Sequence, residues 1–185
     1  MNDQKNILLH SAMKYGLALG VFWVIKYIFF ILSPSIPMLN AVYLLLTAAV
    51  PFVAYYLTKR YRDDDLDGEI SFFHAWRFGI MLYFFAALIV AVEHFIFYQY
   101  IAPPDFISNT FTQLISTMQQ SEIDTSIIES FSKLDVPKPI HMAVQGIFNN
   151  IFYGIIFSIP VASLLCKKKK DSREVETANQ ENENA

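Results

Sequence analysis

The sequence predicts an all-α protein, a four-helix transmembrane bundle with an extracytoplasmic helical hairpin between its third and fourth helices. Three observations predict this fold. Four apolar runs are each long enough to cross a bilayer, which takes about 17–25 helical residues. Hydrophobic residues make up 54% of the 185 residues, yet charged residues gather between these runs and in the tail. Basic residues flank alternate connections, as the positive-inside rule requires of a multi-pass protein.

The chain divides into three parts. Residues 1–14 form a cytoplasmic N-terminus, and residues 167–185 form a basic anchor followed by a disordered acidic tail. Residues 15–166 form the membrane domain. Its helices are predicted at about 15–32, 39–57, 75–101 and 140–165, and its extracytoplasmic loop at 102–139.

Basic residues set the predicted orientation. They lie in the N-terminal segment, the second connection and the C-terminal end, whereas the first connection has none and the third has only Lys133 and Lys138. Both termini should therefore be cytoplasmic. We interpret the lysine run at 167–170 as a topological anchor, with binding of anionic lipid as the alternative.

The first predicted helix carries a G-x-x-x-G spacing at Gly16 and Gly20. Small residues let membrane helices approach closely, and we expect packing within the bundle in preference to dimerisation. The run is too long for the apolar part of a signal peptide, and Lys26 interrupts it. We therefore predict a retained span.

The second connection contains Asp63-Asp64-Asp65-Leu66-Asp67-Gly68, which matches the opening of a calcium-binding EF-hand loop. The twelfth position would be His74, where that loop needs a bidentate glutamate. We interpret the segment as a solvated acidic turn and predict no metal site and no cofactor. Ser71 is the predicted N-cap of the third helix.

Two short motifs carry a family resemblance. Gly68-x-Ile70-Ser71-Phe72-x-x-Ala75 precedes the third apolar run, and Tyr100-Ile101-x-Pro103-x-x-Phe106 follows it. Over roughly residues 10–166 the chain resembles a bacterial family of small integral membrane proteins catalogued as domain of unknown function 4199. The resemblance implies four membrane helices in a bacterial envelope, so the expected location is the bacterial cytoplasmic (inner) membrane. It implies no established activity and no catalytic residues.

The third predicted helix has two different faces. Small and polar residues form the arc expected to pack inside the bundle: Tyr83, Ala86, Ala87, Ala91, Glu93, His94 and Tyr98. Bulky apolar residues form the arc expected to face lipid: Phe84, Phe85, Leu88, Ile89, Val92, Phe95 and Ile96.

The loop at 102–139 contains two amphipathic runs, around 107–118 and 127–134. A helical hairpin could cap the bundle or lie on the outer leaflet. We favour the cap, because few basic residues are present to attract anionic lipid.

Polar residues within the apolar runs are the strongest functional lead. We predict an intramembrane polar layer that consists of Lys26, Glu93, His94, Gln145 and Asn149. Charges at this depth are costly, so the hypothesis includes an ion pair between Lys26 and Glu93. The layer could be a structural network that sets helix register, or a site open to the outer aqueous side that binds a cation or relays protons.

These observations favour a non-catalytic envelope interaction or accessory protein. The alternative is a small transporter or an ion- or proton-conducting protein that uses Lys26, Glu93 and His94. An enzyme is not expected, because no His-Glu-x-x-His motif and no G-x-S-x-G elbow is present. The expected partner is the lipid bilayer, with a membrane-protein partner or a homo-oligomer left open. No basic stripe with interleaved aromatic residues is present, so we expect no nucleic-acid partner.

Overall fold

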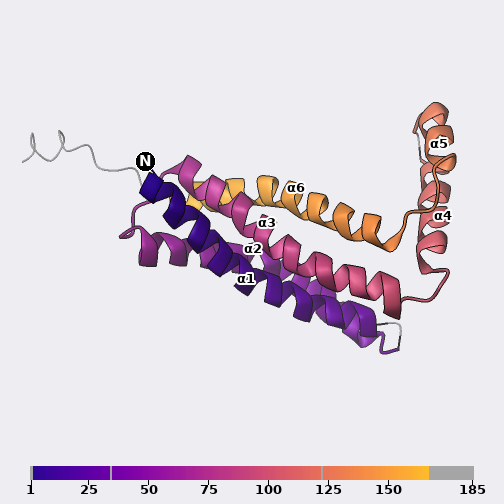
Figure 1. Cartoon of the computed structure of the whole chain (residues 1–185), viewed down its shortest axis with the longest axis horizontal. Helices are drawn as coiled ribbons and strands as arrows, with labels where there is room; N and C mark the ends of the chain where they lie inside the picture. The colour runs from indigo at the N-terminus through magenta and orange to yellow at the C-terminus, as the bar shows by residue number, and fades with distance from the viewer. Residues whose placement is uncertain (1, 34, 122, 167–185) are drawn as a thin grey trace, which may run out of the picture.

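The computed structural model describes residues 2–33, 35–121 and 123–166, and Figure 1 shows its helices. Four long helices lie side by side: α1 (Asn2–Leu32), α2 (Met38–Asp65), α3 (Phe72–Ile96) and α6 (Pro139–Leu165). A short π-helix, η1 (Phe97–Ile101), extends α3. Each long helix is long and apolar enough to cross a membrane. The predicted all-α fold with four candidate spans is confirmed, and the chain is a multi-pass membrane protein.

Helix α3 is the centre of the bundle and packs against both α1 and α6. A Cβ atom built on Gly16 would lie 2.6 Å from Cβ of Phe85, and one built on Gly20 would lie 2.6 Å from Cδ1 of Ile89. The G-x-x-x-G spacing therefore packs within the bundle, as predicted. The same contacts correct the predicted lipid-facing arc, because Phe85 and Ile89 contact α1.

Helix α2 lies at the edge of the bundle. Its buried residues all lie between the middle of the helix and its C-terminal end: Val50, Ala54, Leu57, Thr58 and Tyr61. The first half exposes bulky side chains such as Leu45, which is 71% exposed. Helix α2 packs mainly against α1 and contacts α6 much less. Its first half therefore stands apart from α6, and this leaves room for the cavity described below.

The helices extend beyond the predicted apolar runs. Helix α1 begins at Asn2 and α2 continues to Asp65, and hydrogen bonds join the two helices near these ends. The Ser11 hydroxyl donates to Asp65 Oδ2 at 2.8 Å, and the Tyr15 hydroxyl donates to Asp64 Oδ2 at 3.3 Å. The acidic turn is therefore more than a solvated loop, since two of its carboxylates join α1 to α2.

The connection from α2 to α3 is tightly organised. Asp67 and Gly68 adopt left-handed backbone conformations with φ of 53° and 83°, which turns the chain after α2. The Ser71 side chain accepts a hydrogen bond from the backbone N–H of His74, so the predicted N-cap is confirmed. The Tyr61 ring stacks on Phe78 with centroids 3.9 Å apart.

Two shorter helices, α4 (Phe106–Gln119) and α5 (Thr125–Ser132), form where the amphipathic runs were predicted. They pack against each other and stand crosswise to the long helices at one end of the bundle. Figure 1 shows that much of this pair reaches past α6, which differs from the predicted cap over the bundle. The reason is that α4 and α5 cover part of each other's apolar faces, burying Ile128.

Candidate functional site

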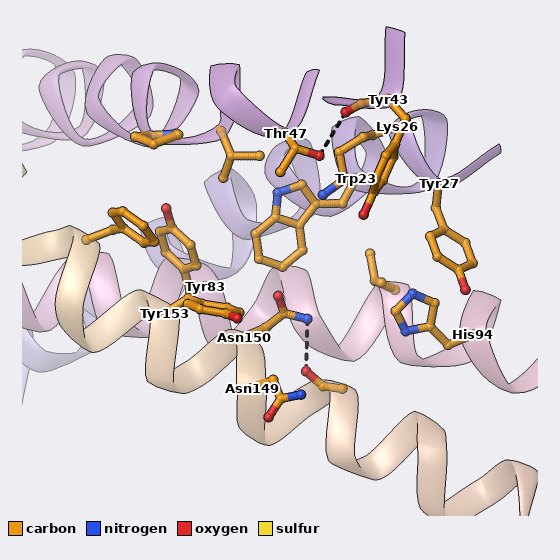
Figure 2. Close-up of a pocket in the computed structure, with 15 residues that line it drawn as sticks. Trp23, Lys26, Tyr27, Tyr43, Thr47, Tyr83, His94, Asn149, Asn150 and Tyr153 are labelled. Atoms are coloured by element: carbon orange, nitrogen blue, oxygen red, sulfur yellow. Dashed lines mark hydrogen bonds between the residues drawn. The ribbon is translucent and has the colours of Figure 1, made fainter. Parts of the chain in front are cut away.

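A cavity of about 500 Å³ lies among the four long helices, in the half of the bundle where α2 stands apart from α6. Each long helix contributes polar or aromatic side chains to its wall, as Figure 2 shows. The polar and aromatic members labelled there are Trp23, Lys26, Tyr27, Tyr43, Thr47, Tyr83, His94, Asn149, Asn150 and Tyr153.

Lys26 of α1 is the positive charge of this cavity. Its Nζ lies 5.4 Å from the ring centroid of Tyr43 and 5.8 Å from that of Trp23. These are cation–π distances, so the two aromatic rings compensate part of the cost of holding an ammonium group at membrane depth. Among the residues that the structure describes, no carboxylate oxygen lies within 4.0 Å of this ammonium.

Glu93 does not complete the predicted polar layer. It does not line the cavity, and the predicted ion pair with Lys26 is not formed among the described residues. Its Oε2 is buried without a hydrogen-bond partner in that part of the chain. The physical reason is helical geometry: adjacent residues of an α-helix point about 100° apart, so Glu93 and the cavity-lining His94 face different directions.

His94 is held by aromatic and backbone packing. Its ring meets that of Tyr27 edge-on, with the centroids 4.2 Å apart. On the α6 side, a Cβ atom built on Gly146 would lie 3.2 Å from Nδ1 of His94. The absence of a side chain at Gly146 therefore lets α6 approach this imidazole closely.

The amides of α6 form the opposite wall. Asn149 lines the cavity and accepts a hydrogen bond from Gln145 Nε2 at 3.0 Å, while Gln145 itself lies outside the lining. Asn150 Nδ2 donates to the carbonyl oxygen of Gly146 at 2.9 Å. Of the five predicted residues, Lys26, His94 and Asn149 thus share one cavity, Gln145 joins it through Asn149, and Glu93 lies apart.

Two buried aromatic side chains belong to this site although they are not among the residues predicted for the polar layer. Trp23 and Tyr83 are 4% and 2% exposed, and their rings pack edge-on with centroids 5.5 Å apart. Trp23 Nε1 and the Tyr83 hydroxyl have no hydrogen-bond partner among the described residues. An aromatic residue at core spacing indicates packing first, so no sequence signal distinguished these two from ordinary core residues.

The family of the chain follows from a comparison with family models. The model described as "Protein of unknown function (DUF4199)" matches residues 14–167. The chain belongs to this family. The match confirms the resemblance carried by the Gly68–Ala75 and Tyr100–Phe106 motifs, and it spans all the residues that line the cavity. No curated protein and no solved structure matches the chain.

The cavity of this DUF4199 protein opens sideways. Its lining includes exposed residues on two helices: Thr47 on α2, and Asn149, Tyr153 and Phe157 on α6. Tyr153 is 51% exposed and Phe157 is 41% exposed. The mouth therefore lies between α2 and α6, on the flank of the bundle that faces the membrane.

The acidic turn of this DUF4199 protein has its own partners. Asp63 pairs with Arg62 at 2.7 Å, and Asp64 pairs with Arg60 at 3.0 Å. Within residues 2–33, 35–121 and 123–166, no group of three or more His, Cys, Asp or Glu side chains could hold a metal ion. The turn stabilises the contact between α1 and α2.

Proposed function

We propose that this protein is a non-catalytic membrane protein that binds another component of the membrane in the cavity between α2 and α6. The observation that carries this proposal is the sideways mouth, which exposes Asn149 and Thr47 at membrane depth. The Thr47 hydroxyl donates to the carbonyl oxygen of Tyr43 at 2.8 Å, but the exposed amide of Asn149 loses hydrogen bonds with water when it faces hydrocarbon. A bound component that covers the mouth would remove this cost.

The chemistry of the lining supports binding more than catalysis. Its described residues include no acid, serine or cysteine, so no lining carboxylate orients His94. The Thr47 hydroxyl donates to the carbonyl oxygen of Tyr43 and not to His94. Lys26, whose ammonium group lies near two aromatic rings, supplies a charge suited to binding. The alternative, conduction of ions or protons through Lys26, Glu93 and His94, has less support because Glu93 lies outside the cavity.

The positive-inside rule supports the rest of the proposal. Lys59, Arg60 and Arg62 lie in the last two turns of α2 and Arg77 lies in the second turn of α3, at the end of the bundle opposite α4 and α5. Lys14 lies in the first half of α1. We propose that both termini face the cytoplasm, that α4 and α5 face the outside, and that the protein resides in a bacterial cytoplasmic membrane as an accessory of other envelope components.

Photo-crosslinking in native membranes tests the proposed binding site. A photoreactive amino acid is placed at Thr47 or Tyr153, which line the mouth, and at the lipid-facing Leu45 as the matched control. The expected result is one discrete adduct at both mouth positions and only a mixture of bulk lipids at Leu45. The same mixture at all three positions would contradict the proposal.

A further inference from the structure

We infer that the component bound between α2 and α6 is a lipid with an anionic head group, and that Lys26 is the counter-charge of its phosphate or carboxylate. This inference rests on the proposed function and names the ligand class. Figure 2 shows Lys26 and Trp23 of α1 projecting into the space between α2 and α6, where such a head group would lie.

The charge of the cavity lining favours the binding of an anion. Lys26 brings a cation to the wall, and the described lining residues include no aspartate or glutamate. The rings of Tyr43 and Trp23 hold the ammonium in place but do not neutralise it. An oxyanion would neutralise it and form a charge-assisted hydrogen bond, the stronger kind in a site shielded from water.

Two buried hydrogen-bond donors of the cavity favour a ligand with acceptor atoms. The indole N–H of Trp23 can only donate a hydrogen bond, and it is buried without an acceptor among the described residues. The Tyr83 hydroxyl is also buried without a hydrogen-bond partner among the described residues, and Tyr83 lines the cavity. Buried donors without acceptors cost free energy, and the oxygen atoms of a phosphate or carboxylate would satisfy them.

The order of residues along the walls favours a lipid over a soluble anion. Along α6 the lining passes from Asn149 and Asn150 to Tyr153 and then Phe157. Along α2 it passes from Tyr43 and Thr47 to Val50 and Pro51. Both walls change from polar to apolar in the same direction, towards the cytoplasmic side in the proposed orientation. A head group near Lys26 with an acyl chain leading inward matches this gradient.

The mouth also suits a lipid. A cavity of about 500 Å³ can hold a head group and the first part of a chain. The rest of the acyl chain would leave the cavity between α2 and α6, past the exposed ring of Phe157, and lie in the bilayer. A soluble anion would not need this sideways opening.

Lipid retention by the full-length protein tests the inference. The protein is reconstituted with vesicles of phosphatidylglycerol, of zwitterionic phosphatidylcholine, or of phosphatidylcholine containing oleate, and lipids that remain after purification are measured by native mass spectrometry. We expect retention of phosphatidylglycerol or oleate and little retention of phosphatidylcholine alone. Inorganic phosphate is the probe for a soluble source: if it binds as well as the lipid, the lipid assignment is wrong.

Variants identify the residues responsible. Lys26→Gln should weaken retention about tenfold, the factor expected from losing one hydrogen bond to a charged group, and Lys26→Arg should restore most of it. Trp23→Phe should weaken retention without changing the net charge. Lys133→Gln is the matched control, because it removes one exposed lysine of the α4–α5 region outside the cavity. Lys26→Arg also keeps the test valid if Lys26→Gln fails to fold.

The outcomes separate this inference from the proposed function. A discrete crosslinked adduct that is a protein helix would overturn the lipid assignment and leave the binding site standing. No discrete adduct at Thr47 or Tyr153 would overturn both. Equal retention of phosphatidylglycerol by Lys26→Gln and by the unchanged protein would show that Lys26 is not the counter-charge.

Discussion

Gly154 of α6 lies directly against Tyr83 of α3. A Cβ atom built on Gly154 would lie 2.6 Å from Cβ of Tyr83 and 2.9 Å from its Cγ, which is a steric clash. Tyr83 is also part of the cavity wall, where its hydroxyl is buried. Gly154 therefore sets both the spacing of α3 and α6 and the position of the Tyr83 hydroxyl, which has no hydrogen-bond partner among the described residues.

Gly154→Ala should destabilise the bundle by about 1–3 kcal/mol, because the added methyl group overlaps a buried ring that cannot move away freely. The measurement is thermal unfolding of the purified protein in detergent. Gly146→Ala is the milder comparison, since its Cβ would meet the imidazole of His94 at 3.2 Å, a tight contact but a looser one than that at Gly154. A melting temperature lowered equally by both changes would contradict the special role of Gly154.

Much of the fold could be predicted from the sequence because a bilayer restricts it strongly. The length and hydropathy of the apolar runs were sufficient to predict four membrane-spanning helices. The face of α3 that points to lipid was predicted correctly at Leu88, Val92 and Ile96, which are exposed. The prediction was wrong at Phe85 and Ile89, because Gly16 and Gly20 of α1 leave space for these two side chains. The periodicity of α3 alone does not show where a neighbouring helix has small residues.

The candidate site was harder to predict. Polarity alone identified Lys26, His94 and Asn149, since few polar residues interrupt the apolar runs. The pairing of Lys26 with Glu93 depends on how each helix is rotated, and the sequence does not specify rotation. The cavity itself arises because the first half of α2 stands away from α6, a relationship between distant segments that no local pattern records.

Tyr61→Phe tests how the α2–α3 connection is held. The Tyr61 hydroxyl and His74 Nε2 are 2.7 Å apart, while the Tyr61 ring stacks on Phe78. The substitution removes the hydrogen bond and keeps the stacking, so we expect a loss of about 0.5–1.5 kcal/mol of stability. Denaturant unfolding in mixed micelles measures it. Tyr56→Phe is the matched control, because Tyr56 is 57% exposed, and an equal loss there would contradict the assignment.

Asp124 makes the start of α5 sensitive to acid. Its carboxylate accepts a hydrogen bond from the backbone N–H of Ser126 at 2.8 Å, and this bond lowers the pKa of the Asp124 carboxyl below its ordinary value. A carboxyl whose pKa is lower in the folded state stabilises that state above its ordinary pKa. This contribution is lost as the pH falls through the lowered pKa.

Hydrogen exchange of the α5 amides should therefore show less protection below the ordinary aspartate pKa than at neutral pH. Asp124→Asn keeps an accepting oxygen but cannot titrate, so its protection should change less with pH. If Asp124→Asn and the unchanged protein lose the same protection on acidification, another group controls the helix.

Glu93 provides the most direct test of how the intramembrane charges are arranged. Its Oε2 is buried without a hydrogen-bond partner among the described residues, so an ionised carboxylate there has no direct contact with Lys26 to offset its desolvation. We expect Glu93→Gln, which keeps the shape and removes the charge, to leave the melting temperature unchanged or to raise it. Breaking a buried ion pair would instead cost about 3–5 kcal/mol, because one charge is left uncompensated.

Glu129→Gln is the matched control for this experiment. Glu129 pairs with Lys133 at 3.7 Å on the surface of α5, where both side chains are more than 70% exposed, and such pairs contribute at most about 1 kcal/mol. If Glu93→Gln lowers the melting temperature much more than Glu129→Gln does, the conclusion that Glu93 forms no ion pair with Lys26 is wrong. That result would also weaken the lipid assignment, because Lys26 would then already have its counter-charge within the protein.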